Sequence, residues 1–307
     1  MKCASIDIGT NTVLLLIVDV GDTIREIADI STTVRLGEGL QETGYISQDA
    51  MDRGLKVLRE YTDMAAAGKV EYISCVGTSA LREAKNSRKF LDLVEDRFGI
   101  PVRIISGRDE ARYTYLSVKN DDITDRERFM IVDIGGGSTE IIAGDRGALQ
   151  DFASLPIGSV KLTEMFIGND PPVEDEIRAA AGYIRSLLDK RFVGYADVLV
   201  GTGGTITTLA SIILGCAYFD KEKIHGFSVS IGTICDAIDM LQTMTVAERK
   251  AVKGMEKGRE DIILQGAVLL REVMLFYGID ECVVSAKGVR YGVIYEHLAE
   301  EAGYGAA

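Results

Sequence analysis

The pattern of apolar runs and turn residues predicts an alternation of strands and helices along the first part of the chain. Helices are marked by 3.6-residue periodicity, capping residues and closing glycines, and are expected at 47–66, 88–98 and 108–119. Short β-branched runs between turn residues predict strands, which are expected at 3–8, 13–20, 24–36, 72–77 and 102–105. Three strands followed by alternating helices and strands indicate one α/β domain.

The same pattern returns after a polar, charged segment at 120–128. Strands are expected there at 129–134, 139–143, 149–155, 198–200 and 282–285, and helices at 160–166, 173–191, 206–214, 231–244, 262–277 and 289–301. The polar segment is typical of a hinge. The sequence therefore predicts a first domain at 1–124 and a second at 125–288, with a closing helix at 289–307 that packs back onto the first domain.

Two phrases repeat across the two halves. Asp7-Ile8-Gly9 and Asp133-Ile134-Gly135 are alike, and each lies between two apolar strands. Such a strand–turn–strand unit in both halves resembles the actin-like ATPase superfamily. The predicted fold class is accordingly α/β, with two ribonuclease-H-like domains facing each other across a cleft and gripping a phosphate chain between them.

The second phrase continues into three glycines, Gly135, Gly136 and Gly137, whose missing Cβ atoms and access to positive φ suit a loop that closes around an anion. Asp133 and Glu140 flank this loop, and carboxylates beside a phosphate commonly hold Mg²⁺ or position a water. A plain tight hairpin is the alternative. By repetition, the turn with Thr10 and Asn11 is a second candidate phosphate site, and Asp7 a further candidate metal ligand.

Glu110 is the candidate general base. It follows a strand–glycine–helix junction, where α/β sheets place their active sites, and hydrolysis of a phosphoanhydride needs a carboxylate to act on water. The alternative is that Asp109 and Glu110 only complement a helix N-terminus. Arg82 is placed to reach an oxyanion or is simply a surface charge.

Gly203, Gly204 and Thr205 form a further glycine-rich turn at the end of a strand. It is a candidate anion-binding or adenosine-facing turn, although such a junction is also used for purely structural reasons. Basic residues at element ends of the second half could line a polyphosphate path, or be solvated charges: Lys161, Arg259, Lys287 and Arg290.

Composition narrows the class of protein. The 307 residues are 47% hydrophobic and 26% charged, as in globular proteins, and the net charge of −13 argues against a broad nucleic-acid surface. No apolar run approaches the roughly 20 residues of a membrane span, and acidic residues interrupt the N-terminal run as they would not in a signal peptide. Five cysteines without a C-x-x-C pair indicate reduced thiols in the cytoplasm.

Six phrases in order carry a resemblance to a known family. They are Asp-Ile-Gly-Thr-Asn-Thr at 7–12, Arg-Leu-Gly-Glu-Gly-Leu at 35–40, Thr-Ser-Ala-Leu-Arg-Glu-Ala-Lys-Asn at 78–86, Ile-Ser-Gly-Arg-Asp-Glu-Ala-Arg at 105–112, Asp-Ile-Gly-Gly-Gly-Ser-Thr-Glu at 133–140 and Gly-Thr-Gly-Gly-Thr at 201–205. Together they make the chain resemble the exopolyphosphatase / guanosine pentaphosphate phosphohydrolase (Ppx/GppA) family, in its short two-domain form.

The resemblance implies a role for each phrase. Glu110 matches the catalytic carboxylate, and Asp133 and Glu140 match the acids that position metal and water. The phosphate cradle corresponds to Gly135, Gly136, Gly137 and Ser138, Arg82 to a phosphate-facing arginine, and Arg259 to a basic position of the second domain. The implied cofactor is Mg²⁺, with another divalent cation or K⁺ as alternatives, and a homodimer is the oligomer that the resemblance suggests.

The function expected from these residues is Mg²⁺-dependent release of terminal phosphate from inorganic polyphosphate, short chains in particular. Many members of the family carry an arginine where this chain has Leu14, which speaks against guanosine polyphosphate as substrate. The alternatives are a guanosine pentaphosphate (pppGpp) phosphohydrolase, a non-catalytic sensor of polyphosphate or nucleotide, and an actin-like kinase. No nucleic acid or membrane partner is expected.

Overall fold

The structure is a computed structural model that describes residues 1–21, 23–192 and 194–301. The chain divides into two compact units: unit 1 contains 1–117 and the segment from Val289 on, and unit 2 contains Val118–Gly288. The α/β fold class predicted from the sequence is confirmed for both. The division between the units falls between Ser117 and Val118, inside a helix and a few residues before the predicted hinge at 120–128. The hinge therefore remains a prediction.

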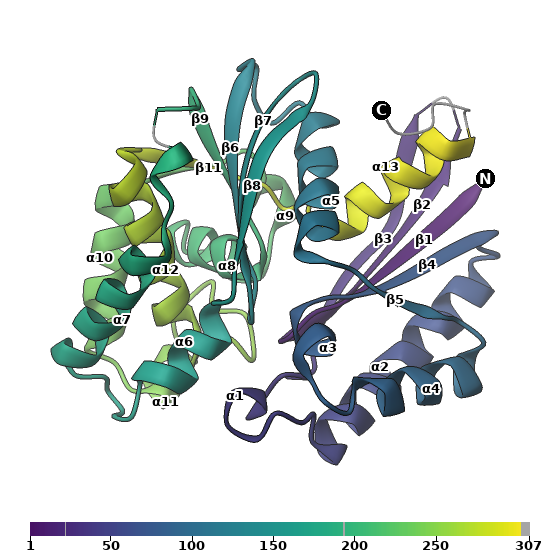
Figure 1. Ribbon diagram of the computed structural model, residues 1–307, viewed down its shortest axis with the longest axis horizontal. Coiled ribbons are helices and arrows are strands. Elements are labelled where there is room, and N and C mark those ends of the chain that lie inside the picture. Colours follow the sequence, from purple (N-terminus) through teal and green to yellow (C-terminus); the bar gives the residue numbers. More distant parts are fainter. Residues whose placement is uncertain (22, 193, 302–307) are drawn as a thin grey trace. The chain divides into compact units, whose positions relative to one another are not determined.

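Unit 1 is built on a mixed sheet whose order, within the described residues, is β3-β2-β1-β4-β5 (Figure 1). Its strands are Lys2–Ile8 (β1), Thr12–Val20 (β2), Ile24–Thr33 (β3), Tyr72–Gly77 (β4) and Val102–Ile104 (β5). Its helices are Leu40–Thr43 (α1), Gln48–Ala67 (α2), Ser79–Glu83 (α3), Ser87–Phe98 (α4), Gly107–Lys119 (α5), which crosses the unit boundary, and Val289–Glu301 (α13).

The two faces of this sheet are covered by different helices because side chains alternate along a strand. On β1, Ala4, Ile6 and Ile8 point into a core shared with α2 and α4. Cys3 points the other way and packs against Tyr291 of α13, while α5 and α13 together cover β4 through contacts of Tyr113 and Val293. Asp7 follows the alternation of Cys3, so it belongs to the face that α5 and α13 cover.

Unit 2 repeats this order with one added edge strand, as β10-β11-β9-β6-β7-β8 within the described residues (Figure 1). Its strands are Arg128–Ile134 (β6), Thr139–Asp145 (β7), Leu149–Leu155 (β8), Val198–Thr202 (β9), Ser228–Ser230 (β10) and Glu281–Val284 (β11). Its helices are Ser159–Phe166 (α6), Glu174–Leu187 (α7), the 3₁₀ turn Lys190–Phe192 (η1), Gly204–Ile213 (α8), Lys221–Ile224 (α9), Ile231–Gln242 (α10), Val246–Arg249 (α11) and Ile263–Tyr277 (α12).

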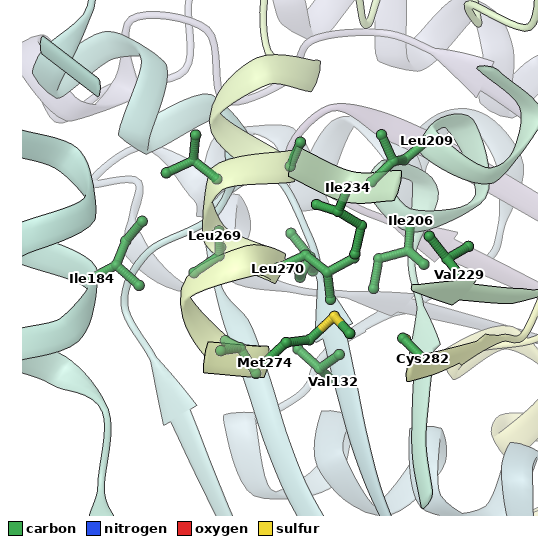
Figure 2. Close-up of a cluster of buried hydrophobic side chains, with 14 of the residues drawn as sticks. Val132, Ile184, Ile206, Leu209, Val229, Ile234, Leu269, Leu270, Met274 and Cys282 are labelled. Atoms are coloured by element: carbon green, nitrogen blue, oxygen red, sulfur yellow. The ribbon is translucent and has the colours of Figure 1, made fainter. Parts of the chain in front are cut away.

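Helix α12 lies at the centre of the unit 2 core. Figure 2 shows its residues Leu269, Leu270 and Met274 beside Val132 of β6 and Ile206 of α8, all of them buried. Helices α7 and α10 gather on the same side of the sheet (Figure 1). The second sheet therefore holds its strand ends rigidly, which is what a site built on those ends requires.

The two largest differences between predicted and observed boundaries are at the third strand and at the helix predicted at 173–191. The third strand was expected to reach Leu36 but ends at Thr33, because the amides of Val34 and Arg35 turn back to bond the carbonyl of Asn11. Arg35 has a φ of 50°, an uncommon value for a residue other than glycine. The helix predicted at 173–191 ends at Leu187 and is followed by the separate turn η1.

Gly182 offers a test of helix α7 in unit 2. It lies on an exposed face of α7, and a Cβ added there would meet nothing within 4 Å. Because alanine favours a helix interior over glycine by about 1 kcal/mol, we expect Gly182→Ala to raise the free energy of unfolding by about 0.5–1 kcal/mol. Urea denaturation measures this, and a destabilised variant would contradict the placement of Gly182.

Candidate active site

Helix α5 is capped by the residues around its first turn. The capping is done by Ser106 and Asp109: the Ser106 hydroxyl donates to Asp109 Oδ2 at 2.7 Å and accepts from the Asp109 amide at 3.1 Å. The hydrogen bond from the Ser106 hydroxyl, foremost among several contacts, lowers the pKa of Asp109. Asp109 therefore serves the helix N-terminus, as the alternative predicted for it.

The carboxylate of Glu110 is held by an arginine instead. Arg82 Nη1, from helix α3, donates to Glu110 Oε2 at 2.6 Å and to the carbonyl of Ile105 at 3.0 Å. Glu110 is only 7% exposed, so this charge pair is largely removed from solvent. A guanidinium has five N–H donors, so Arg82 is able to hold Glu110 and an anion oxygen at the same time. The structure thus brings together two residues that the sequence proposed separately.

The first candidate turn is wrapped by a second segment of unit 1. The amides of Val34 and Arg35 both bond the carbonyl of Asn11, at 2.9 and 2.8 Å, and the amide of Gly37 bonds the carbonyl of Thr10 at 2.8 Å. Thr10 and Asn11 are buried, and the Asn11 Nδ2 group has no hydrogen-bond acceptor among the described residues. Since buried donors are rarely left in this state, this atom is a candidate contact for a ligand oxygen.

Asp7 and Asp133 end equivalent strands but have different neighbours. In the antiparallel pairing of β1 with β2, Asp7 lies opposite Leu14. In the equivalent pairing of β6 with β7, Asp133 lies opposite Glu140. Directly paired residues of an antiparallel ladder carry their side chains on the same face of the sheet. Two acids are therefore placed side by side in unit 2, whereas Asp7 has an apolar neighbour across the strand pair.

The Asp133–Glu140 pair is buried, with exposed fractions of 9% and 1%. Glu140 Oε1 accepts a hydrogen bond of 2.8 Å from the hydroxyl of Ser154 on β8, which orients its carboxylate. The described residues contain no cluster of three or more His, Cys, Asp or Glu side chains suited to a metal ion. Mg²⁺ is commonly held by one or two carboxylates together with substrate phosphates, so the pair fits this cofactor in that mode.

The glycine loop after β6 is clamped by the start of α6. The amide of Ser159 donates to the carbonyl of Gly135 at 3.0 Å, and that of Val160 donates to the carbonyl of Gly136 at 2.9 Å. At Gly158 a Cβ would lie 2.5 Å from the Gly135 oxygen and from the Gly136 carbonyl carbon. The N-terminal amides of this helix are therefore used to fix the loop.

The reason for the glycines differs from the one predicted. The positive-φ glycines of the described residues do not include Gly135, Gly136 or Gly137. Close approach explains one of these positions, since a Cβ on Gly135 would lie 3.1 Å from the carbonyl oxygen of Ser138. Ser138 itself is buried, and its carbonyl accepts from the Gly135 amide at 3.1 Å.

The turn after β9 lies between an acid and a base. A Cβ on Gly203, whose φ is 94°, would lie 2.8 Å from Asp133 Oδ1, and one on Gly204 would lie 1.9 Å from Arg259 Nη2. The guanidinium of Arg259 therefore lies on the backbone at the start of α8, and its Nε also donates to Glu256 at 2.9 Å. The structure thus groups Asp133, Glu140, the turn and Arg259 within unit 2.

Thr205 contributes to this turn through its backbone. Its side chain is 2% exposed and packs closely on Gly266 of α12. The first amides of a helix have no partner within the helix, so the amide of Thr205 rather than its hydroxyl is the group available to an anion. Lys161, by contrast, is a nearly buried lysine whose ammonium donates to the carbonyl of Pro156 at 3.3 Å.

Sequence reasoning missed Gly158, Ser159 and Ser154. The available signal for Gly158 and Ser159 was a Gly-Ser pair at the start of a predicted helix. This pair repeats the Gly-Ser composition of the loop 135–138, which it contacts. Ser154 carries no local signal, because its importance comes only from pairing with Glu140 across two strands.

Two units with one strand order, glycine turns at strand ends and buried acids define a phosphate-handling α/β protein of the actin-like fold. The family model for the Ppx/GppA phosphatase family matches residues 16–301. The chain belongs to this family, as its motifs predicted, and it is therefore a hydrolase. No helix in the described part of the chain has the length and apolarity needed to cross a membrane.

Individual relatives agree with this assignment. The chain is 31% identical to exopolyphosphatase 2 of Mycobacterium tuberculosis, over 95% of this chain and 97% of the relative. The Ppx/GppA family member of Aquifex aeolicus has a similar structure, with 34% identity, a TM-score of 0.84 and 98% of each chain covered. The exopolyphosphatase of Cytophaga hutchinsonii has 28% identity and a TM-score of 0.90, again over 98% of each chain.

Proposed function

We propose that this protein is an exopolyphosphatase that releases terminal phosphate from inorganic polyphosphate. The observation that carries the proposal is the setting of Glu110, a nearly buried carboxylate that is held by Arg82. A carboxylate placed in this way suits a general base, and the adjacent guanidinium suits the charge of a phosphate. Relatives named exopolyphosphatase match almost the whole chain.

In the proposed reaction a water gives its proton to Glu110, and its oxygen bonds to the terminal phosphorus. The bond from this phosphorus to the bridging oxygen breaks, so the products are orthophosphate and a chain shorter by one unit. Arg82 is proposed to bind a phosphate oxygen while it orients Glu110. In unit 2, the amides of the loop 135–138 and of the turn 203–205, with Arg259, are proposed to bind phosphate.

Asp133 and Glu140 are the residues proposed to hold Mg²⁺. When bound, this ion would neutralise negative charge on phosphate oxygens held by unit 2. Asp7, opposite Leu14, is proposed to act beside α5 on its face of the first sheet rather than as a partner in a carboxylate pair. The resemblance would place an arginine at the position of Leu14, so this chain is proposed to prefer polyphosphate to guanosine polyphosphates.

The test is phosphate release from short polyphosphate, long polyphosphate and pppGpp, each with Mg²⁺ or with EDTA. We expect release from polyphosphate, faster on short chains, and loss of this release on chelation with recovery when Mg²⁺ is restored. Release from pppGpp alone would show that the substrate is this guanosine polyphosphate and not inorganic polyphosphate. Tight Mg²⁺-dependent binding without turnover would instead indicate a sensor, and would overturn the proposal.

A further inference from the structure

A buried charge cluster lies outside the site described above. Asp121, which follows α5, is 8% exposed. Its Oδ1 is 3.0 Å from Lys287 Nζ, and its Oδ2 is 3.3 Å from His225 Nε2. One carboxylate therefore joins two basic side chains that are distant from it in the sequence, all of them in unit 2.

His225 lies between the backbone of Ala286 and the carboxylate of Asp121. Its Nδ1 accepts a hydrogen bond from the amide of Ala286 at 3.3 Å, and its Nε2 lies 3.3 Å from Asp121 Oδ2. His225 and Lys287 together fix the segment around Ala286 to the carboxylate of Asp121.

The cluster lies where the chain passes between its units. The chain enters unit 2 at Val118 and leaves it after Gly288. Arg146, in the turn after β7, also donates to the carbonyls of Lys119 and Asp121, at 3.0 and 3.1 Å. The first crossing segment is therefore anchored to unit 2 through both its backbone and the side chain of Asp121.

The second crossing segment reaches the phosphate turn. The carbonyl of Lys287 accepts a hydrogen bond from the hydroxyl of Thr202, and the amide of Ser285 donates to the carbonyl of Gly201 at 2.7 Å. Thr202 directly precedes Gly203 and is paired with Asp133 in the parallel ladder of β6 with β9. A continuous series of contacts thus runs from Asp121 through Lys287 and Thr202 to the turn.

We propose that Asp121 is a positioning residue: through Lys287 and Thr202 it fixes the turn 203–205 for phosphate binding. Its effect on catalysis rests on the proposed function, whereas its effect on the turn does not. Thr202 has two neighbours that matter to the site, Gly203 and Asp133. Because Asp121 holds Lys287, and Lys287 bonds Thr202, Asp121 affects the positions of Gly203 and Asp133 without contacting substrate.

The charge state of Asp121 supports this role. Burial by itself raises the pKa of Asp121, but the contacts with His225 and Lys287 outweigh it and hold the pKa below its ordinary value. A carboxylate with a depressed pKa contributes stability above that ordinary value and loses its contribution as the pH falls through the native pKa. The cluster is therefore intact at neutral pH.

The test is Asp121→Asn, which keeps the side-chain shape and removes the charge. We expect KM for polyphosphate to rise about 10- to 100-fold with a smaller change in kcat, because the turn that binds phosphate is displaced. Amide hydrogen exchange at 201–205 should be about tenfold faster in the absence of substrate. Asp122→Asn is the matched control: Asp122 is the exposed neighbour, the charge change is identical, and both readouts should equal the wild type.

Lys287→Met, alone and combined with Asp121→Asn, completes a double-mutant cycle. If the ion pair acts as a unit, the double variant should resemble either single variant, so that the two effects on exchange and on KM do not add. The Lys287→Met series also covers the case in which Asp121→Asn fails to fold. Additive effects, or wild-type exchange at 201–205 in both single variants, would overturn the positioning role. If the wild type does not hydrolyse polyphosphate, the proposed function fails, and the exchange measurement still decides the role of Asp121.

Discussion

Glu110→Gln is expected to lower the rate of phosphate release from polyphosphate by about 10²–10⁴-fold, which is the usual contribution of a general base. Glutamine keeps the size of the side chain and can still accept a hydrogen bond from Arg82, but it does not take a proton from water. The cap of α5 is made by Ser106 and Asp109, so the helix should remain in place. The loss should therefore appear in kcat, without a matching loss of folding stability.

Glu95→Gln is the matched control for this variant. Glu95 is exposed on α4, and its substitution removes the same charge from the same unit. Initial rates and urea denaturation are measured for both variants. A Glu110→Gln enzyme that is folded and retains a rate within a factor of about three of the wild type would show that another group activates the water.

Gly158→Ala is expected to have the second largest effect, on both stability and activity. The φ of Gly158 is −155°, which any residue adopts, so glycine is needed here for space alone. The added Cβ would lie 2.5 Å from backbone atoms of Gly135 and Gly136. No side-chain rotation relieves this clash, because the position of a Cβ is fixed by its own backbone. We expect a loss of about 1–3 kcal/mol in the free energy of unfolding, as for overpacking in general.

The same clash moves the phosphate loop away from α6. A displacement of about 1 Å near a reacting group commonly costs about 10²-fold in rate, so phosphate release should fall by that order. Gly182→Ala, which adds the same methylene in open space, is the control and should keep the wild-type rate. If Gly158→Ala has wild-type stability and rate, the clamp between α6 and the loop is wrong.

Much of the fold followed from local patterns, because each unit is made of short strands and amphipathic helices bounded by glycines. The helix at 289–301 was predicted with the bounds that it has in the structure. The end of β3 was not, since it depends on a hydrogen bond from Arg35 to Asn11 and on a left-handed backbone that arginine rarely adopts. Such long-range backbone bonds leave no periodic signal.

Sequence motifs predicted the turns of the candidate site, but they did not predict which residues lie opposite each other on neighbouring strands. The repeated Asp-Ile-Gly phrase located both turns, but only the strand register shows that Asp133 lies opposite Glu140 and Asp7 opposite Leu14. The sequence also could not separate Asp109 from Glu110, because adjacent acids at a helix start have the same local pattern. Contacts with Ser106 and Arg82 separate them.

Hydrolysis of polyphosphate of defined length in ¹⁸O-labelled water, followed by ³¹P NMR and mass spectrometry, tests the proposed reaction most directly. We expect orthophosphate that carries one labelled oxygen, together with chains that are one unit shorter. Unlabelled orthophosphate, with the label in the shortened chain, would mean that water attacks the penultimate phosphorus, and would contradict the proposed reaction. Internal fragments, or no reaction at all, would contradict the assignment of this chain as an exopolyphosphatase.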